Sequence, residues 1–266
     1  MRTKRISGFF VFGMAFLLIA SLIVAYPIAL ALQRSLSIKG LGNYAAVLAK
    51  VNVFRNLWNS IQVTAITLAG TIVICSLAAF AFSKLNFRGR NILFLFMMMG
   101  MMVPSSATIF PLFQIIKFLK LVNRPVSQTL PYITGNSIFG LLLLKIYFDA
   151  LPNEMMESAR IDGAGSFRIF AQIMLPNTLP GLSILFVNTF MGAWNELLIA
   201  ITFISRREYM TMAALPISFA SSPGRSDNSV GELFACLIMC MIPVIIFYIA
   251  AQKMIIRGMT EGTVKG

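Results

Sequence analysis

The chain has 266 residues, of which 58% are hydrophobic and only 12% are charged. With a mean hydropathy of +0.83, it cannot bury its apolar side chains in one water-soluble core, so the composition indicates a membrane protein. The formal net charge of +13 comes from 22 basic residues scattered over short connections and helix ends. This pattern indicates anchoring at a membrane surface and argues against a nucleic-acid partner.

Six stretches of the chain are long and apolar enough to cross a bilayer. Such a span takes about 20 residues as a helix, because a backbone in hydrocarbon has to satisfy its own hydrogen bonds. In chain order, the predicted spans are residues 8–32, 60–83, 91–116, 127–148, 179–204 and 233–255. The sequence therefore predicts an all-α polytopic membrane protein that forms a single domain over residues 1–266.

Basic residues in short connections set the predicted orientation, because Lys and Arg are retained on the cytoplasmic side. They precede the first span and occupy the tight connection after the second: Arg2, Lys4 and Arg5, then Lys84, Arg88 and Arg90. With six spans, both termini are then cytoplasmic. The first span is too long in its apolar part to be a cleaved secretion signal.

Prolines interrupt several predicted spans: Pro27, Pro104, Pro111, Pro131 and Pro243. A proline inside a membrane helix bends it and frees a carbonyl, which is tolerated where neighbouring groups or water satisfy that carbonyl. Pro104, which is followed by Ser105, is therefore a candidate hinge and a candidate lining of a solute pathway. Prolines are also simply frequent in membrane helices, and the sequence leaves this alternative open.

The connection between the fourth and fifth spans, residues 149–178, is polar and carries helix signals. Pro152 suits the first turn of a helix, and Gly163 and Gly165 suit the positive φ that ends one. We expect a first helix of about three turns, then a second helix that Ser166 caps and Pro176 ends.

The first of these two helices combines charge with small side chains, as expected of a knob that enters a groove on a partner. Its charged members are Glu154, Glu157, Arg160 and Asp162, with Ser158 and Ala159 between them. The alternative is an amphipathic connector that rests on lipid headgroups.

Glu196 is an ionisable residue inside a predicted span, where charge is costly and often marks function. It follows Trp194 and Asn195, about eight residues from the outer end of the fifth span and so roughly 12 Å below that surface. It can line a water-filled cavity, or it can join Asn195 in hydrogen bonds to neighbouring helices. The sequence leaves both interpretations open.

Two polar segments complete the map. Residues 205–232 form a long outer loop with both signs of charge, which suits either contact with an external partner or a flexible linker. Residues 256–266 form a short tail with several glycines, which is expected in the cytoplasm.

Enzymatic and metal chemistry are disfavoured by what the sequence lacks. It has no histidine, which is the commonest general base and the commonest transition-metal ligand. It also has no glycine-rich phosphate-binding loop with its lysine, so any ATP has to be bound by a partner. The three cysteines, Cys75, Cys236 and Cys240, fall inside predicted spans, where disulfides are not expected, and Cys236 and Cys240 are interpreted as packing residues. We therefore expect no metal site and no cofactor in this chain.

The connection 149–178 also matches a docking motif. The motif residues are Glu157, Ala159, Asp162-Gly163-Ala164, Leu175-Pro176 and Pro180. This pattern resembles the EAA motif of ABC importer permeases, with Ser158 in place of the middle alanine. The run Trp194-Asn195-Glu196 and the glycine-containing tail are similar to those of carbohydrate-type, MalG-like permeases.

The resemblance implies the transmembrane domain of a type I importer in a bacterial inner membrane, paired with a second, homologous permease subunit. Two ATPase subunits that bind ATP and Mg²⁺, and an extracytoplasmic solute-binding protein, would complete the complex. Residues 149–178 are then the coupling loop, with these ATPase-docking residues: Glu154, Glu157, Ser158, Ala159, Arg160, Asp162, Gly163, Ala164 and Gly165. The tail residues Gly262, Thr263, Val264, Lys265 and Gly266 would also reach the ATPase subunits.

The implied function is import of a sugar or oligosaccharide by ATP-driven alternating access. The candidate pathway residues are Pro104, Ser105, Trp194, Asn195 and Glu196. A polyol or a glycerol-phosphate-like compound is the alternative solute. A secondary transporter would be expected to show paired intramembrane charges and a repeated half, and neither is evident. A membrane assembly protein with no transport role would leave the docking motif unexplained.

Overall fold

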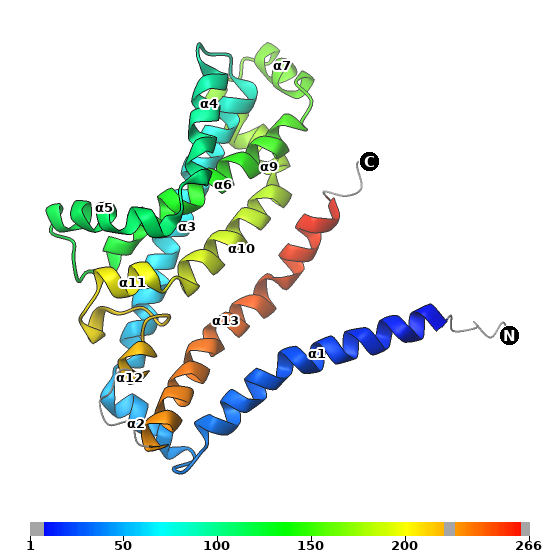
Figure 1. Cartoon of the computed structure of the whole chain (residues 1–266). Coiled ribbons are helices and arrows are strands. Elements are labelled where there is room, and N and C mark those ends of the chain that lie inside the picture. Colours follow the sequence, from blue (N-terminus) through cyan, green and yellow to red (C-terminus); the bar gives the residue numbers. More distant parts are fainter. Residues whose placement is uncertain (1–7, 221–226, 262–266) are drawn as a thin grey trace. The chain divides into compact units, whose positions relative to one another are not determined.

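The computed structural model describes the backbone of residues 8–220 and 227–261, and the side chains of residues 12–220 and 230–252. All regular elements in these ranges are helical (Figure 1). The chain divides into two compact units, residues 1–51 with 216–243 and residues 52–215 with 244–266. The single-domain organisation stays a prediction.

The first unit contains α1 (Gly8–Ser35), α2 (Gly42–Lys50), α12 (Ile217–Ala220) and the first part of α13 (Asp227–Glu261). Asn43 ties the turn between α1 and α2, because its Nδ2 donates to the carbonyls of Ser35 at 2.9 Å and Ser37 at 2.8 Å. The buried Glu232 pairs with Lys39 at 3.5 Å and with Lys50. These polar contacts join the α1–α2 turn to α13.

The second unit is built on α3 (Val53–Lys84), α6 (Thr129–Asp149) and α10 (Leu179–Asn195), which run side by side (Figure 1). Gly140 of α6 lets them approach closely. A Cβ at this position would lie 2.6 Å from Cys75 Sγ of α3 and 2.8 Å from Leu185 of α10. Cys75 is buried there and has a free thiol.

The predicted span 91–116 is not one continuous helix. It consists of α4 (Arg90–Met99), η1 (Gly100–Met102) and α5 (Ser105–Phe118), with a bend of 102° between α4–η1 and α5. Val103 is extended, with φ −83° and ψ 116°, because the ring of Pro104 disfavours helical geometry in the residue before it. The interruption predicted at Pro104 is thus a sharp corner, whereas α1, α5 and α13 continue through Pro27, Pro111 and Pro243.

The chain from the coupling loop onward is also broken. It runs through α7 (Glu154–Ile161), α8 (Ser166–Arg168), the π-helix η3 (Ile169–Met174) and α9 (Leu175–Asn177), then turns by 79° into α10. The predicted span 179–204 ends early, because α10 stops at Asn195 and α11 (Leu198–Phe203) begins after an extended Glu196.

The other end of the second unit contains the short helices η2 (Pro125–Gln128) and η4 (Arg207–Tyr209), and asparagines hold the chain in and around η4. Asn123 Oδ1 accepts from the Ser205 N–H at 2.8 Å, and Asn56 Nδ2 donates to the carbonyls of Arg207 and Met210 at 2.8 Å. The start of the predicted outer loop is therefore fixed in place and is not a flexible linker.

Four helical stretches in the described residues are long and apolar enough to cross a membrane: Phe12–Ser35, Val53–Lys84, Pro125–Asp149 and Val230–Gln252. The number becomes six if each bent pair, Arg90–Met102 with Ser105–Phe118 and Ser166–Asn177 with Leu179–Asn195, is one span. The all-α polytopic class predicted from the sequence is confirmed. The exact bounds of the six spans stay predictions.

Candidate functional site

The predicted coupling loop begins with a helix whose charges suit its ends. Asn153 precedes α7, and its carbonyl accepts from the N–H groups of Met156 at 2.9 Å and Glu157 at 3.0 Å. Glu154 and Glu157 lie in the first turn and Arg160 lies in the last. Acidic groups near a helix N-terminus and basic groups near its C-terminus are favourable, because they complement the helix dipole.

Gly163 ends α7 as predicted. Its φ is +80°, and the following Ala164 N–H reaches back to the Ala159 carbonyl at 2.9 Å. The same prediction for Gly165 is wrong, since its φ of −70° and ψ of 160° are extended. One left-handed residue is enough to close the helix, after which the chain has to lead away from it.

Further expectations for this loop are also wrong. The helix α7 has eight residues, a little over two turns, and it starts after Asn153 and not at Pro152. Ser166 makes no side-chain cap, and Pro176 lies in the first turn of α9, where its missing N–H is tolerated. The expected second helix is largely the π-helix η3, a form that is frequent at functional sites.

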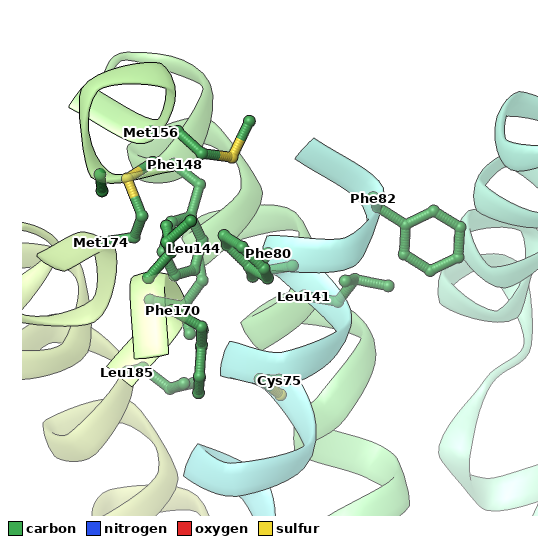
Figure 2. Close-up of a cluster of buried hydrophobic side chains, with 13 residues drawn as sticks. Cys75, Phe80, Phe82, Leu141, Leu144, Phe148, Met156, Phe170, Met174 and Leu185 are labelled. Atoms are coloured by element: carbon green, nitrogen blue, oxygen red, sulfur yellow. The ribbon is translucent and has the colours of Figure 1, made fainter. Parts of the chain in front are cut away.

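The inner face of α7 packs on a cluster of buried side chains from α3, α6 and η3 (Figure 2). Met156 and Ala159 of α7 are both buried in this cluster. Beneath them, the Phe80 ring lies 5.9 Å from that of Phe148 in an edge-to-face arrangement and 5.3 Å from that of Phe170. Because such buried side chains contribute about 1.5–3 kcal/mol each, α7 is firmly attached to the helices that carry it.

The outer face of α7 and the turn after it are exposed. Of the predicted docking residues, the exposed ones are Glu154, Glu157, Ser158, Arg160, Asp162, Gly163 and Gly165, whereas Ala164 is half-buried and Ala159 belongs to the inner face. Two apolar side chains that the sequence reasoning missed join them. Ile161 is 87% exposed and Phe167 is 74% exposed.

The exposure of Ile161 could have been predicted from its position on the helix. Met156 and Ala159 are three residues apart and share the buried face, so Ile161, two residues further on, has to lie away from that face. Large apolar side chains beside charges, held on a firm base, are typical of a surface that a partner covers.

A second feature is a cavity of about 700 Å³ in the second unit, within the range of small-molecule sites. The η1–α5 corner, α6 and the α10–α11 break form its wall. Its lining includes polar, aromatic and small residues: Pro104, Ser105, Thr108, Tyr132, Thr134, Asn136, Phe139, Gly192 and Glu196. Pro104 and Ser105 therefore line the same cavity as Glu196, which is distant from them in the sequence.

The Glu196 carboxylate receives three hydrogen bonds at the break between α10 and α11. The Tyr132 hydroxyl of α6 donates to it at 3.0 Å, and the N–H groups of Leu198 and Ile199 donate at 3.1 Å and 2.9 Å. Glu196 thus caps α11 and also lines the cavity. The two interpretations left open by the sequence, hydrogen bonding to a neighbouring helix and lining a cavity, both apply to this residue.

The neighbours of Glu196 do not line the cavity. Trp194 is buried, with its ring stacked 5.3 Å from that of Phe190, and the Asn195 amide donates to the Met191 carbonyl of its own helix at 3.0 Å. Neither residue belongs to the cavity wall, so their place in a solute pathway has no support from this geometry.

Asn136 is a lining residue that sequence reasoning missed. Its Nδ2 donates to the Tyr132 carbonyl at 2.7 Å, and its Oδ1 would lie 3.1 Å from a Cβ placed on Gly192. Gly192 therefore leaves room for this amide at the cavity wall. An amide near the middle of the predicted span 127–148 was the available signal.

The predicted tail contacts and the question of a metal site lie outside the two features described above. The tail residues Gly262, Thr263, Val264, Lys265 and Gly266 lie outside the described residues. Among the described residues, no group of three or more His, Cys, Asp or Glu side chains is arranged to hold a metal ion.

Broken apolar helices around a cavity with polar groups in its lining, and a helical knob on the connecting loop, are typical of a transmembrane transport subunit. Residues 70–261 match the family model of the binding-protein-dependent transport system inner membrane component. The chain belongs to this family, the permease subunits of ABC importers, which are multi-pass proteins of the inner membrane. It is thus a transport component and not a catalytic one, and the resemblance found in the sequence is confirmed.

Characterised relatives and a solved structure agree with this assignment. The chain is 31% identical over 212 residues to the trehalose transport system permease protein SugB of Mycobacterium tuberculosis, covering 79% of this chain and 76% of that protein. It is 28% identical over 221 residues to the diacetylchitobiose uptake system permease protein NgcG of Streptomyces coelicolor, covering 83% and 73%. A bacterial ABC transporter involved in the import of the acidic polysaccharide alginate shares the fold, with a TM-score of 0.79, 20% identity and coverage of 95% of this chain and 98% of that one.

Proposed function

We propose that this permease imports a sugar or oligosaccharide by ATP-driven alternating access, with the cavity at Glu196 in its solute pathway. Relatives named for trehalose, diacetylchitobiose and α-glucoside transport support the solute class. The cavity supports it as well. Carbonyl, hydroxyl and carboxylate groups beside Phe139 suit a solute that carries many hydroxyl groups on an apolar ring.

The coupling loop is the proposed contact with the ATPase subunits. Its exposed face offers the carboxylates of Glu154 and Glu157 together with the apolar Ile161 and Phe167. A groove with a basic residue and an apolar floor would complement this face. The tail Gly262–Gly266 is proposed to reach the same ATPase dimer.

Force reaches the membrane helices through the buried cluster beneath α7. Met156 and Ala159 join Phe80 of α3 and Phe148 of α6 in one packed body (Figure 2). Packed interiors resist deformation, so a displacement of α7 has to move the ends of α3 and α6 with it. The corners at Pro104 and Glu196 supply the places where the other spans can change direction.

The proposed complex contains this chain, a second homologous permease subunit, two ATPase subunits that bind ATP and Mg²⁺, and an extracytoplasmic solute-binding protein. Both termini lie in the bacterial cytoplasm, and residues 205–212, which are fixed by Asn56 and Asn123, face the binding protein. The surrounding lipid contacts apolar side chains such as Phe12 and Leu22 of α1, which are exposed along that helix.

The observation that carries the proposal is the exposed, firmly supported face of α7. Reversing its charge with Glu157→Lys should abolish solute uptake by the assembled complex and weaken ATPase recruitment, while the permease stays folded. Asp149→Lys is the matched control, because it reverses an exposed carboxylate that lies before α7 and pairs with Lys145. Normal uptake by the Glu157→Lys complex would show that α7 does not dock the ATPase.

A further inference from the structure

We infer that Glu196 determines the charge specificity of the pathway, favouring neutral or cationic solutes over anionic ones. The inference rests on the proposed function, in which the cavity belongs to the solute pathway. The same fold occurs in a transporter for an acidic polysaccharide, so a preference for or against negative charge has to come from lining residues and not from the fold.

The charge on the described part of the cavity wall is negative. Among the described residues that line it, Glu196 is the acidic side chain, and no Lys or Arg is present to balance it. Lys145, the basic residue of α6, is paired with Asp149 at 2.6 Å and lies over the Phe94 ring, away from the lining. The carboxylate therefore sets the sign of the potential in this chain's part of the cavity.

Hydrogen bonding fixes the carboxylate without cancelling its charge. The Tyr132 hydroxyl and the N–H groups of Leu198 and Ile199 are neutral donors, and an ionised carboxylate is purely an acceptor. No ion pair to Glu196 is found in the described part of the chain, so its negative charge acts on whatever enters the cavity.

The hydroxyl groups of a neutral solute can form hydrogen bonds with the same cavity wall. Glu196 and the Asn136 Oδ1 offer acceptors at the wall, and each can receive a hydrogen bond from a solute hydroxyl. A phosphate or carboxylate on the solute would instead face the carboxylate in a setting less polar than water, where repulsion is stronger. A neutral glycoside or polyol therefore fits, and a glycerol-phosphate-like solute does not.

The test measures how fast charged reagents reach a thiol in the cavity of the complete reconstituted complex. Thr134 lines the cavity, is exposed, and uses its hydroxyl only on carbonyls of its own helix, so Thr134→Cys places a thiol there with little disturbance. The reagents are anionic 2-sulfonatoethyl, cationic 2-(trimethylammonio)ethyl and neutral methyl methanethiosulfonate. The unmodified chain gives the background of its native cysteines.

Glu196→Gln in the Thr134→Cys chain should lower the ratio of the cationic to the anionic rate by about 15- to 55-fold. A unit charge acting over roughly 7–10 Å at an effective dielectric constant of about 40 changes each rate by about four- to sevenfold, in opposite directions for the two reagents. The neutral reagent should react at the same rate with the Thr134→Cys chain whether or not it also carries Glu196→Gln. Phe118→Cys, at the exposed end of α5 and outside the lining, is the matched control, where Glu196→Gln should leave the ratio unchanged.

The outcomes separate the two proposals. If Thr134→Cys reacts with all three reagents but Glu196→Gln leaves the ratio unchanged, the charge specificity is refuted and the pathway stands. If even the neutral reagent fails at Thr134→Cys while Phe118→Cys reacts, the cavity is closed to water, and the proposed pathway falls together with the charge specificity.

Discussion

Ile161 provides the sharpest quantitative test of the docking surface. Its side chain is 87% exposed at the end of α7, on the side away from the buried Met156 and Ala159. Ile161→Ala removes about three methylene equivalents, each of which contributes about 0.8 kcal/mol when it is buried. If the ATPase covers the exposed fraction, the loss is about 2 kcal/mol, or about 30-fold in affinity.

The assay compares ATPase binding by the purified permease pair, with Ile161→Ala in this subunit. Leu41→Ala, which truncates another strongly exposed apolar residue outside the coupling loop, should leave the affinity unchanged. Met156→Ala should behave differently again, lowering the thermal stability of the subunit because its side chain belongs to the buried cluster. An affinity within twofold of the parent for Ile161→Ala would refute the reasoning that a partner covers this face.

Two further predictions concern local backbone structure. Gly163→Ala should destabilise the subunit by about 1 kcal/mol, because alanine is disfavoured at φ +80°. Gly165→Ala should leave the stability unchanged, because Gly165 is equally free of steric contacts but has an extended backbone. Thermal unfolding of the two variants in detergent checks this, and equal losses of stability would contradict it. Asn123→Ala removes the acceptor of the Ser205 and Arg206 N–H groups, each bond contributing about 1 kcal/mol. Trypsin should then cut faster after Arg206, and a cleavage rate equal to that of the parent would mean that this segment is held by other contacts.

The sequence was informative wherever one residue decides the local backbone. Gly163 is required because the chain turns through positive φ directly after α7, and Pro104 breaks its span because it constrains Val103. The docking motif identified the family because its residues occur in a fixed register. The apolar runs identified a membrane protein because lipid imposes helices of a certain length.

The sequence was uninformative where tertiary contacts determine the backbone conformation or the exposure of a side chain. Glu196 breaks its span because its carboxylate caps α11 and receives the Tyr132 hydroxyl, and Tyr132 is distant in the sequence. Gly165 and Ser166 carry residue types that fit several backbone states, and the packing of η3 selects one of them. Phe167 shares the helical spacing of Phe170 but is exposed, because the π-helix begins after it and changes the faces.

The central claim is that this permease is driven by an ATPase partner through the coupling loop. The most direct measurement is uptake of radiolabelled trehalose, diacetylchitobiose or an α-glucoside into proteoliposomes that contain the permease pair, with and without the ATPase subunits and ATP. We predict accumulation of one of these sugars against its gradient only when the binding protein, the ATPase subunits and hydrolysable ATP are all present. Accumulation of the same sugar by the permease pair alone would contradict the account.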